Sequence, residues 1–251
     1  MSTSAGQTLP DHTQLPDSDG KPVENFFEFP QCMLLTDCLL PVLRGLHPDG
    51  RFAIGQNSGI YWEYTDPPLN GCKAPDWFYV PGVSPSIVDG QYRRSYVLWQ
   101  EKVPPTLIIE VSSGDGAEER DQTPRMGKFW IYEQMIRAPY YAIFVPDTQE
   151  LSVHHLVGGT YQRQEPNDRG RYFIPPLGVE LGLWTGPFQN NTGTWLRWFT
   201  VDGRPLPTAD ERARMERDRA EQERQRAEQE RQRAERLAER LRALGGDTNG
   251  V

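Results

Sequence analysis

Two acidic residues adjoin apolar, strand-like runs, which is an unusual place for a carboxylate. Asp76 directly precedes Trp77–Val80, and Glu110 directly follows Leu107–Ile109. Burying an unpaired charge is costly, and two acids at the same edge of adjacent strands would repel each other unless a cation lay between them. A magnesium ion meets that requirement, because it takes hard oxygen ligands that include one or two carboxylates together with waters.

Two further groups could complete such a site. The backbone carbonyl of Val111 could add a ligand. The ammonium group of Lys128 could orient an attacking water or stabilise developing negative charge. A bound metal would lower the pKa of a water and polarise a phosphoryl oxygen. The pattern therefore indicates metal-assisted chemistry, with Asp76 and Glu110 as the metal ligands and Lys128 as the assisting cation.

Each of these residues also has a structural interpretation. Asp76 follows Pro75 and could be a turn residue. Glu110 could pair with an arginine, and Lys128 could be a solvated lysine on a helix. Short patterns of this kind produce false positives. The spacing alone therefore leaves both interpretations open.

The elements that must position these residues follow from the hydrophobic pattern. Runs rich in β-branched or aromatic residues and bounded by Gly, Pro, Asn or Asp predict strands at Phe52–Ile54, Ile60–Tyr64, Trp77–Val80, Leu107–Val111, Tyr140–Val145 and Leu151–Leu156. Helical spacing predicts one helix over Phe26–Gly45, with Pro41 as a kink or break, and another over Arg125–Arg137, with Pro124 at its start. Strands interrupted by helices indicate an α/β sheet domain.

Composition restricts the class of protein. The chain of 251 residues has a net charge of −8; residues 1–210 carry −9 and residues 211–242 carry +2. A domain this acidic is not a generic nucleic-acid binder, because phosphate binding draws on Lys and Arg. The three cysteines form no C-x-x-C pattern, no apolar run is long enough to span a membrane, and the polar N-terminus lacks the apolar core of a signal peptide. We therefore expect a cytoplasmic protein without a membrane partner.

Three regions differ in composition. Residues 1–25 are rich in Ser, Asp, Gly and Pro and predict a flexible N-terminal arm. Residues 26–205 carry the strand and helix pattern of the α/β domain. Residues 206–246 predict a long charged helix, for which Thr208 and Glu211 have the spacing of a capping box.

The charged helix follows a seven-residue period. AEQERQR at residues 220–226 recurs unchanged at residues 227–233. Alanine occupies one core position of the heptad, but the other core position holds glutamate until Leu237. The pattern fits a homodimeric coiled coil, and it fits equally a solvated helix held by pairs such as Glu228 with Arg231.

A basic and aromatic patch precedes the Glu110 strand. It consists of Tyr92, Arg93, Arg94, Tyr96, Trp99 and Lys102. Such a patch could contact a phosphate backbone. It could equally be a set of surface arginines over a tucked aromatic cluster, since cation–π contacts are common.

Other chemistry-bearing residues fit structural roles better. Glu118, Glu119 and Asp121 could add to a metal site, but a solvated acidic cluster at a helix start is the favoured interpretation. His154 and His155 are adjacent, so on a strand they would face opposite sides and could not easily share a metal. We interpret both histidines as structural.

Several segments together resemble a known family in their order and spacing. They are LPDSDGKP at 15–22, APDWFYVPG at 74–82, SYVLWQE at 95–101, PPTLIIEVSS at 104–113, KFWIYEQM at 128–135, YYAIFVPD at 140–147 and PLGVELG at 176–182. The chain resembles the Uma-type family of restriction-endonuclease-like proteins in the PD-(D/E)XK nuclease superfamily. The resemblance implies a restriction-endonuclease-like mixed sheet flanked by helices, with a metal-dependent site that cleaves phosphodiester bonds. Asp76 then matches the motif's "D", Glu110 its "(D/E)" and Lys128 its lysine.

The chain departs from the superfamily pattern in two places. The usual lysine lies two residues after the second acid, where this chain has Ser112, so the lysine's role passes to Lys128 on the following helix. Family members often carry another acid in the region where this chain has the polar residues 56–58. Glu63 is the nearest acid to that region.

These observations predict a DNA endonuclease that depends on Mg²⁺, with Mn²⁺ as a substitute. A homodimer formed through the C-terminal helix would suit double-strand cleavage, because two-fold symmetry places two sites on opposite strands. The alternative is a catalytically inactive nuclease fold that acts as a scaffold through its C-terminal helix, because a fold does not establish a function. A small-molecule binding domain has only the Trp and Tyr content in its favour.

Overall fold

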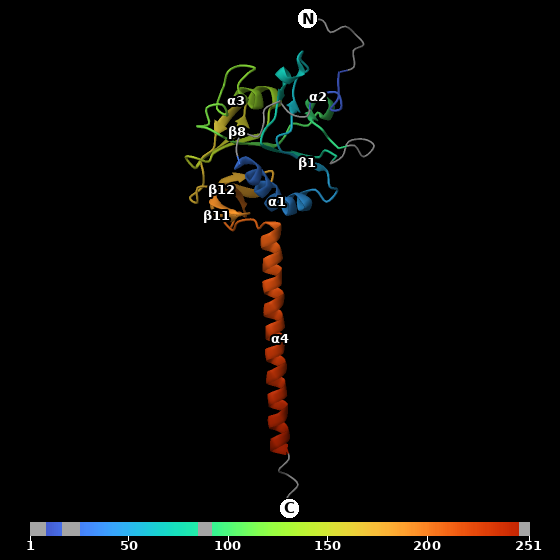
Figure 1. Ribbon diagram of the computed structural model, residues 1–251, viewed down its shortest axis with the longest axis vertical. Helices are drawn as coiled ribbons and strands as arrows, with labels where there is room; N and C mark the ends of the chain where they lie inside the picture. The colour runs from blue at the N-terminus through green and yellow to red at the C-terminus, as the bar shows by residue number, and fades with distance from the viewer. Residues whose placement is uncertain (1–8, 17–25, 85–91, 246–251) are drawn as a thin grey trace, which may run out of the picture. The chain divides into compact units, whose positions relative to one another are not determined.

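The computed structural model describes residues 9–16, 26–84 and 92–245 (Figure 1). The chain divides into two compact units, residues 1–206 and residues 207–251. The first unit contains three sheets and their covering helices, and the second contains one long helix.

A mixed six-stranded sheet forms the centre of the first unit. Its strands, in spatial order, are β1 (Phe52–Gly55), β4 (Trp77–Pro81), β6 (Leu107–Val111), β7 (Tyr140–Val145), β8 (Glu150–Val157) and β9 (Thr160–Arg163). β6 and β7 are parallel, and every other neighbouring pair is antiparallel. β6 and β7 are buried along their whole length, which accounts for their nearly continuous apolar sequences.

Two smaller sheets complete the fold. One is an antiparallel set of β10 (Tyr172–Ile174), β11 (Val179–Phe188) and β12 (Asn191–Phe199). The other orders β3 (Cys72–Lys73), β2 (Ile60–Tyr61) and β5 (Tyr96–Val97), with β2 and β5 parallel. The short helices η1 (Pro68–Gly71) and α2 (Leu98–Glu101) adjoin this second sheet.

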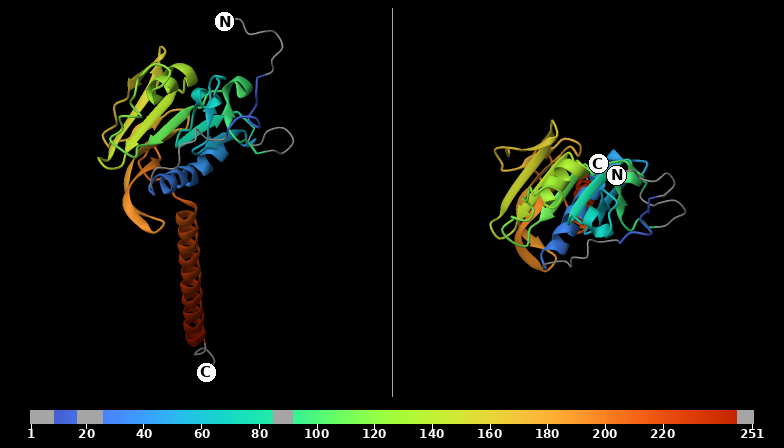
Figure 2. Two further views of the ribbon diagram at one scale, coloured as in Figure 1. Left: turned by 45° about the horizontal axis from the view of Figure 1, so that its top comes forward. Right: turned by 90° about the horizontal axis from the view of Figure 1, so that it is seen from above.

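Helix α1 (Glu28–Leu46) packs in one hydrophobic core with one face of the main sheet and with β10–β12 (Figure 2). Trp198 on β12 donates a hydrogen bond from Nε1 to the carbonyl of Leu35 on α1 at 3.0 Å. The side chain of Gln31 bonds both the amide and the carbonyl of Leu196. The helix continues through Pro41, which is exposed, so the predicted break does not occur.

The opposite face of the main sheet is covered by α3 (Lys128–Trp130) and the π-helical η3 (Ile131–Ile136). These two segments connect β6 to the parallel strand β7, as a crossover must. The helix was predicted over Arg125–Arg137, but it begins at Lys128, three residues further along the chain. Residues 123–127 form a turn instead, in which the amides of Met126 and Gly127 bond the carbonyl of Thr123.

The sequence predicted β6 and β7 with the observed bounds, whereas other strands differ. The strand predicted over Ile60–Tyr64 ends at Tyr61; one further bond, from the amide of Trp62 to the carbonyl of Gly71, continues the pairing with β3 up to the end of η1. The long hairpin β11–β12 was not predicted. β11 contains two glycines and a proline, which hide its strand pattern.

Residues 9–16, part of the predicted N-terminal arm, pack on the first unit. Leu15 is 3% exposed. Trp99 donates to the carbonyl of Pro10 at 3.1 Å, and Tyr61 donates to that of Pro16 at 2.9 Å. This part of the arm is therefore held against the domain; residues 1–8 and 17–25 lie outside the described residues.

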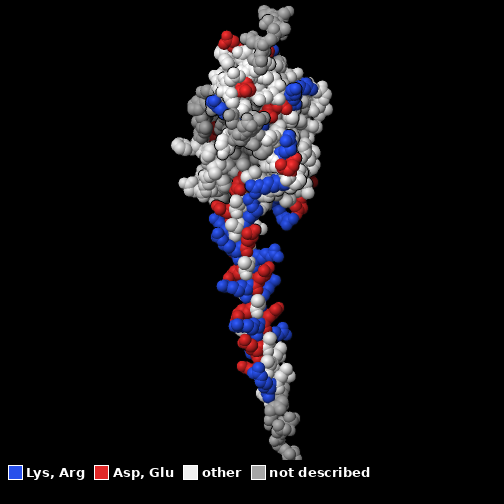
Figure 3. Space-filling model, turned by 90° about the vertical axis from the view of Figure 1, so that its right-hand side faces the viewer, with Lys and Arg blue, Asp and Glu red and all other residues white. Residues whose placement is uncertain are grey.

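The second unit is helix α4 (Ala209–Gly245). Its start has the predicted capping box: the amide of Glu211 bonds Oγ1 of Thr208 at 3.1 Å, and the amide of Thr208 bonds Oε2 of Glu211 at 2.8 Å. Blue and red side chains alternate along this helix in Figure 3. Over the residues that the structure describes, no helix is long and apolar enough to cross a membrane.

Candidate active site

Asp76 and Glu110 lie on neighbouring strands of the main sheet. Trp77 pairs with Ile109 across the antiparallel β4–β6 ladder. Asp76 precedes Trp77 and Glu110 follows Ile109, so the two acids lie opposite each other. The two carboxyl groups are close enough for each to influence the pKa of the other. Oδ2 of Asp76 also accepts the amide N–H of Val111 at 2.6 Å. The sheet register alone therefore brings the two acids together.

Glu110 is fully buried and both of its carboxylate oxygens have partners. Oε1 accepts the hydroxyl of Tyr132 at 2.5 Å, and Oε2 lies 3.2 Å from Nζ of Lys128. Lys128 and Tyr132 are four residues apart on the continuous helical segment α3–η3, so both project from the same side of it. One short helical segment thus supplies both side chains that hold the buried carboxylate.

Lys128 is surrounded by carboxylates. Besides Glu110, its ammonium group lies 3.3 Å from Oε1 of Glu119 and 4.0 Å from Oε1 of Glu118. The start of α3 is fixed at Gly127, where an added Cβ would lie 2.1 Å from the carbonyl oxygen of Asp121. Only glycine fits this close approach, which places Lys128 over the acids.

The electrostatics of the site are those of crowded, desolvated acids. Burial, followed by the nearby charge of Glu110, raises the pKa of Asp76 well above its ordinary value. Burial also raises the pKa of Glu110, although Lys128 and the Tyr132 hydroxyl act against that rise. Burial disfavours the charge of Lys128, but the surrounding carboxylates outweigh it and raise the pKa of the ammonium group. Lys128 therefore stays charged beside acids that favour protonation or a second cation.

A third carboxylate near the pair comes from helix α1. Glu28 is buried in the first turn of α1, and its charge contributes to raising the pKa of Asp76. Asn57 donates to Oε1 of Glu28 at 2.7 Å, while its backbone amide bonds the carbonyl of Asp76 at 3.3 Å. Asn57 thus links the helix to the chain at Asp76. By contrast Glu63, the acid nearest in sequence to residues 56–58, forms an ion pair with Arg125 at the surface.

Sequence reasoning missed three contributors to this environment: Glu28, Glu119 and Tyr132. Glu119 was interpreted as part of a solvated cluster, yet it is 6% exposed and contacts Lys128. Tyr132 was given no role at the site; its position four residues after Lys128 was the available signal. Glu28 gave no local signal, because its proximity depends on how α1 packs.

The donor set fits a hard divalent cation in part. Across residues 9–16, 26–84 and 92–245, no group of three or more His, Cys, Asp and Glu side chains has the arrangement of a complete metal site. A pair of carboxylates with raised pKa values is nonetheless the set that Mg²⁺ uses when waters fill its other positions. Asp76 and Glu110 are the residues that would hold it. The amide of Val111, whose carbonyl was predicted as a ligand, positions Asp76.

The two histidines lie on opposite faces of β8, as predicted. The ring of His154 meets that of Phe129 edge-on at 5.1 Å, and the ring of His155 stacks on that of Tyr140 at 4.5 Å. They contact different neighbours, as residues on opposite faces of β8 should.

A family model described as "Uma2: Putative restriction endonuclease" matches residues 19–190. The chain belongs to the Uma2 family. The match spans the main sheet, α1, α3–η3 and all the acids of the site. The observed mixed α/β fold is compatible with a restriction-endonuclease-like fold, and the description of the Uma2 family indicates nuclease activity. No curated protein matches the chain.

Proposed function

We propose that this Uma2 protein is a metal-dependent endonuclease that hydrolyses phosphodiester bonds of DNA. The observation that carries the proposal is the convergence of Asp76, Glu110 and Lys128 on one face of the main sheet. The strand register places Asp76 opposite Glu110, and Nζ of Lys128 lies 3.2 Å from Oε2 of Glu110. Strongly displaced pKa values in a cluster of this kind are typical of functional sites.

Mg²⁺, with Mn²⁺ as a substitute, is the cofactor we propose, held by the carboxylates of Asp76 and Glu110. A bound ion of this kind supplies charge stabilisation at a phosphoryl oxygen and lowers the pKa of water. The protein's own contribution is to fix the ligands: Val111 holds Asp76 through its amide, and Tyr132 holds Glu110 through its hydroxyl. Such preorganisation avoids reorganisation during the reaction.

Lys128 has a separate role in the proposal. Its ammonium group is held charged by Glu110, Glu119 and Asp76, and the Lys128 side chain is 16% exposed, so part of it is open to a substrate. A fixed positive charge at this position stabilises negative charge that develops on the phosphoryl group. It takes the place of the lysine that the superfamily pattern puts at Ser112.

A second copy of the chain is the partner we propose for α4. Ala213, Ala220, Ala227 and Ala234 recur at one heptad position, and Leu237 and Leu241 on the same helix are 53% and 69% exposed. Pairing of two helices would cover these apolar side chains. Sedimentation equilibrium of the full chain should give a dimer, and Leu237→Glu with Leu241→Glu should shift it to a monomer.

The test of the enzymatic proposal is cleavage of plasmid DNA in Mg²⁺ and in Mn²⁺. Asp76→Asn and Glu110→Gln keep size and remove charge, and each should lower the rate at least about 100-fold, since metal stabilisation is worth several kcal/mol and each 1.36 kcal/mol is tenfold. Glu150→Gln is the matched control, because Glu150 is 43% exposed and pairs only with Arg120 and Arg163 among the described ion pairs. It should cleave as the wild type does.

Two outcomes would overturn the proposal. Equal traces of cleavage in the wild type, Asp76→Asn and Glu110→Gln would point to a contaminant. Absence of cleavage by the wild type in both metals would favour the scaffold alternative, in which α4 is the functional part.

A further inference from the structure

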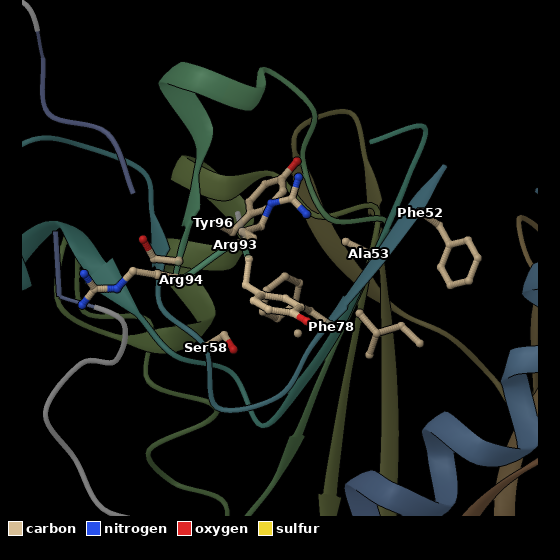
Figure 4. A pocket seen from close by; sticks show the side chains of 11 residues that line it. Phe52, Ala53, Ser58, Phe78, Arg93, Arg94 and Tyr96 are labelled. Atoms are coloured by element: carbon tan, nitrogen blue, oxygen red, sulfur yellow. The ribbon is translucent and has the colours of Figure 1, made fainter. Parts of the chain in front are cut away.

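A pocket of about 260 Å³ is lined by residues of β1 and β4 at the edge of the main sheet and by residues 92–96 (Figure 4). Phe78 lines it and follows Asp76 by two residues on β4, so the two side chains project to the same side. Their Cα atoms are about 7 Å apart at the usual rise of a strand. The pocket therefore adjoins the proposed cleavage centre along the strand.

The segment between β1 and β2 links the pocket to the site. Ser58 on this segment lines the pocket, and the amide of the preceding residue, Asn57, bonds the carbonyl of Asp76 at 3.3 Å. Asn57 also holds Glu28. A ligand in the pocket would thus contact the same segment that fixes the backbone at Asp76.

Aromatic rings form much of the pocket. The rings of Phe78 and Tyr96 meet edge-on with centroids 6.1 Å apart, and both lie beside the cavity in Figure 4. Tyr92 also lines the pocket and is 91% exposed. A flat, aromatic ligand suits such walls, because rings stack or meet edge-to-face with favourable geometry.

One polar group in the pocket lacks a partner. Ser95 is 2% exposed and lines the pocket, and its Oγ makes no hydrogen bond within the described part of the chain. A buried hydroxyl without a partner is unfavourable, so such groups are normally satisfied. A ligand with donors and acceptors at its edge would supply the missing bond.

The charges of the pocket are positive in an otherwise acidic unit. Arg93 and Arg94 line it, and none of its described lining residues is acidic. Arg93 is fixed by Glu101 at 2.8 Å and lies over the ring of Tyr96 at 5.7 Å. Arg94 is exposed. Its Nη1 donates to the carbonyl of Thr13 at 3.3 Å. In the predicted basic and aromatic patch, Arg93 and Tyr96 are therefore tucked, Arg94 contacts the N-terminal segment, and the ring of Tyr92 is exposed.

We propose that this pocket binds one unpaired nucleotide of the strand that is cleaved, its base among the aromatic rings and its phosphate toward the arginines. The inference rests on the proposed nuclease function and names the form of its substrate. A base in a duplex is stacked and cannot enter a pocket unless it is unpaired or extruded. The volume lies just below the range of sites for drug-sized ligands, so it suits a single base.

The test is binding of a short single-stranded DNA that carries one 2-aminopurine, measured in EDTA with the full chain. The wild type should bind and change the 2-aminopurine fluorescence. Tyr92→Ala should weaken binding about tenfold, as loss of one stacking contact does. Ala53→Leu, which fills the pocket, should weaken it further. Tyr64→Ala is the matched control, since Tyr64 is 49% exposed and lies outside the pocket.

Several results would overturn the inference. The first two are absence of binding by the wild type and equal binding by Tyr92→Ala and Tyr64→Ala. The others are competition by a fully paired duplex as strong as by the single strand, and displacement of the probe by inorganic phosphate as effective as by a mononucleotide. Tyr92 is exposed, so its variant should keep the wild-type unfolding midpoint. The binding assay needs neither metal nor cleavage, so it can be interpreted even if the protein proves not to be a nuclease. If the protein cleaves DNA but Tyr92→Ala binds as the wild type does, the pocket proposal is rejected and the nuclease proposal stands.

Discussion

The acid cluster around Lys128 and the helix α4 both contain pairs of a basic and an acidic side chain at similar distances, but in opposite surroundings. Lys128 lies 3.2 Å from a Glu110 side chain that is 1% exposed. On α4, Arg231 also lies 3.2 Å from Glu228, but these side chains are 68% and 46% exposed. Water screens the second pair and not the first. Burial raises the pKa of Glu110, whereas the hydrogen bond from Gln232 and the charge of Arg231 lower the pKa of the exposed Glu228. Burial, more than contact distance, therefore decides the direction of the shift and which pair has a large energy.

The strongest test of this comparison is removal of one cation from each region. Lys128→Met leaves Asp76, Glu110 and Glu119 without their counterion and should lower the free energy of unfolding by about 3–5 kcal/mol, as the breaking of a buried pair does. Arg231→Met on α4 should change it by no more than about 1 kcal/mol. Urea unfolding followed by tryptophan fluorescence and by far-ultraviolet circular dichroism measures both.

A second substitution sharpens that result. Glu119→Gln added to Lys128→Met removes one of the unbalanced acids and should restore part of the lost stability, because neighbouring charges are not additive. Equal losses in Lys128→Met and Arg231→Met would show that burial does not set the energy of these pairs.

Addition of Mg²⁺ should affect only the buried region. An ion bound by Asp76 and Glu110 relieves their mutual repulsion and binds the folded state alone. The unfolding temperature should then rise by about 5 °C or more at a concentration 100 times the dissociation constant. Asp76→Asn should remove this rise. A rise of equal size in that variant would place the ion elsewhere.

His154 tests the effect of burial on a histidine of β8. Burial lowers the pKa of His154, with Arg163 and Arg120 adding to the effect. The unfolded chain therefore takes up this proton more readily than the folded chain does. Stability should fall as the pH drops through the ordinary histidine range near 6.5. Urea unfolding between pH 7.5 and 5 should show a shallower fall for His154→Phe, and parallel curves for the two proteins would contradict the assignment.

The smallest expected effect is on the exposed helix. Glu228→Gln removes one partner of Arg231 and keeps the size of the side chain. It should lower the stability of α4 only slightly at low salt, because water screens an exposed pair. The difference should vanish at 1 M salt, where exposed charges are screened. Thermal unfolding of the helix by circular dichroism gives both values, and a salt-independent loss would mean that the pair is shielded from water.

The same contrast explains what the sequence could predict. β6 and β7 are continuous apolar runs, so their bounds were predicted, and Glu110 was conspicuous because a carboxylate at the end of such a run needs a partner. Local signals also predicted the Thr208 cap and the Glu228–Arg231 pair.

Long-range packing accounts for the rest. Glu28 reaches the site only because α1 packs on the sheet, and Glu119 only because the segment after β6 folds back over Lys128. No periodic pattern in the sequence predicts the position of either residue. The late start of α3 likewise depends on the close approach of Gly127 to Asp121.

The unchanged repetition of AEQERQR within α4 has a consequence for how the protein can evolve. Seven residues make nearly two helical turns, so duplication or loss of one repeat alters the helix length by about 10 Å and turns its faces by only about 20°. Every contact between neighbouring side chains is then reproduced. Lineages of this protein can therefore lengthen or shorten α4 in uniform steps while the sequence of the folded domain stays untouched.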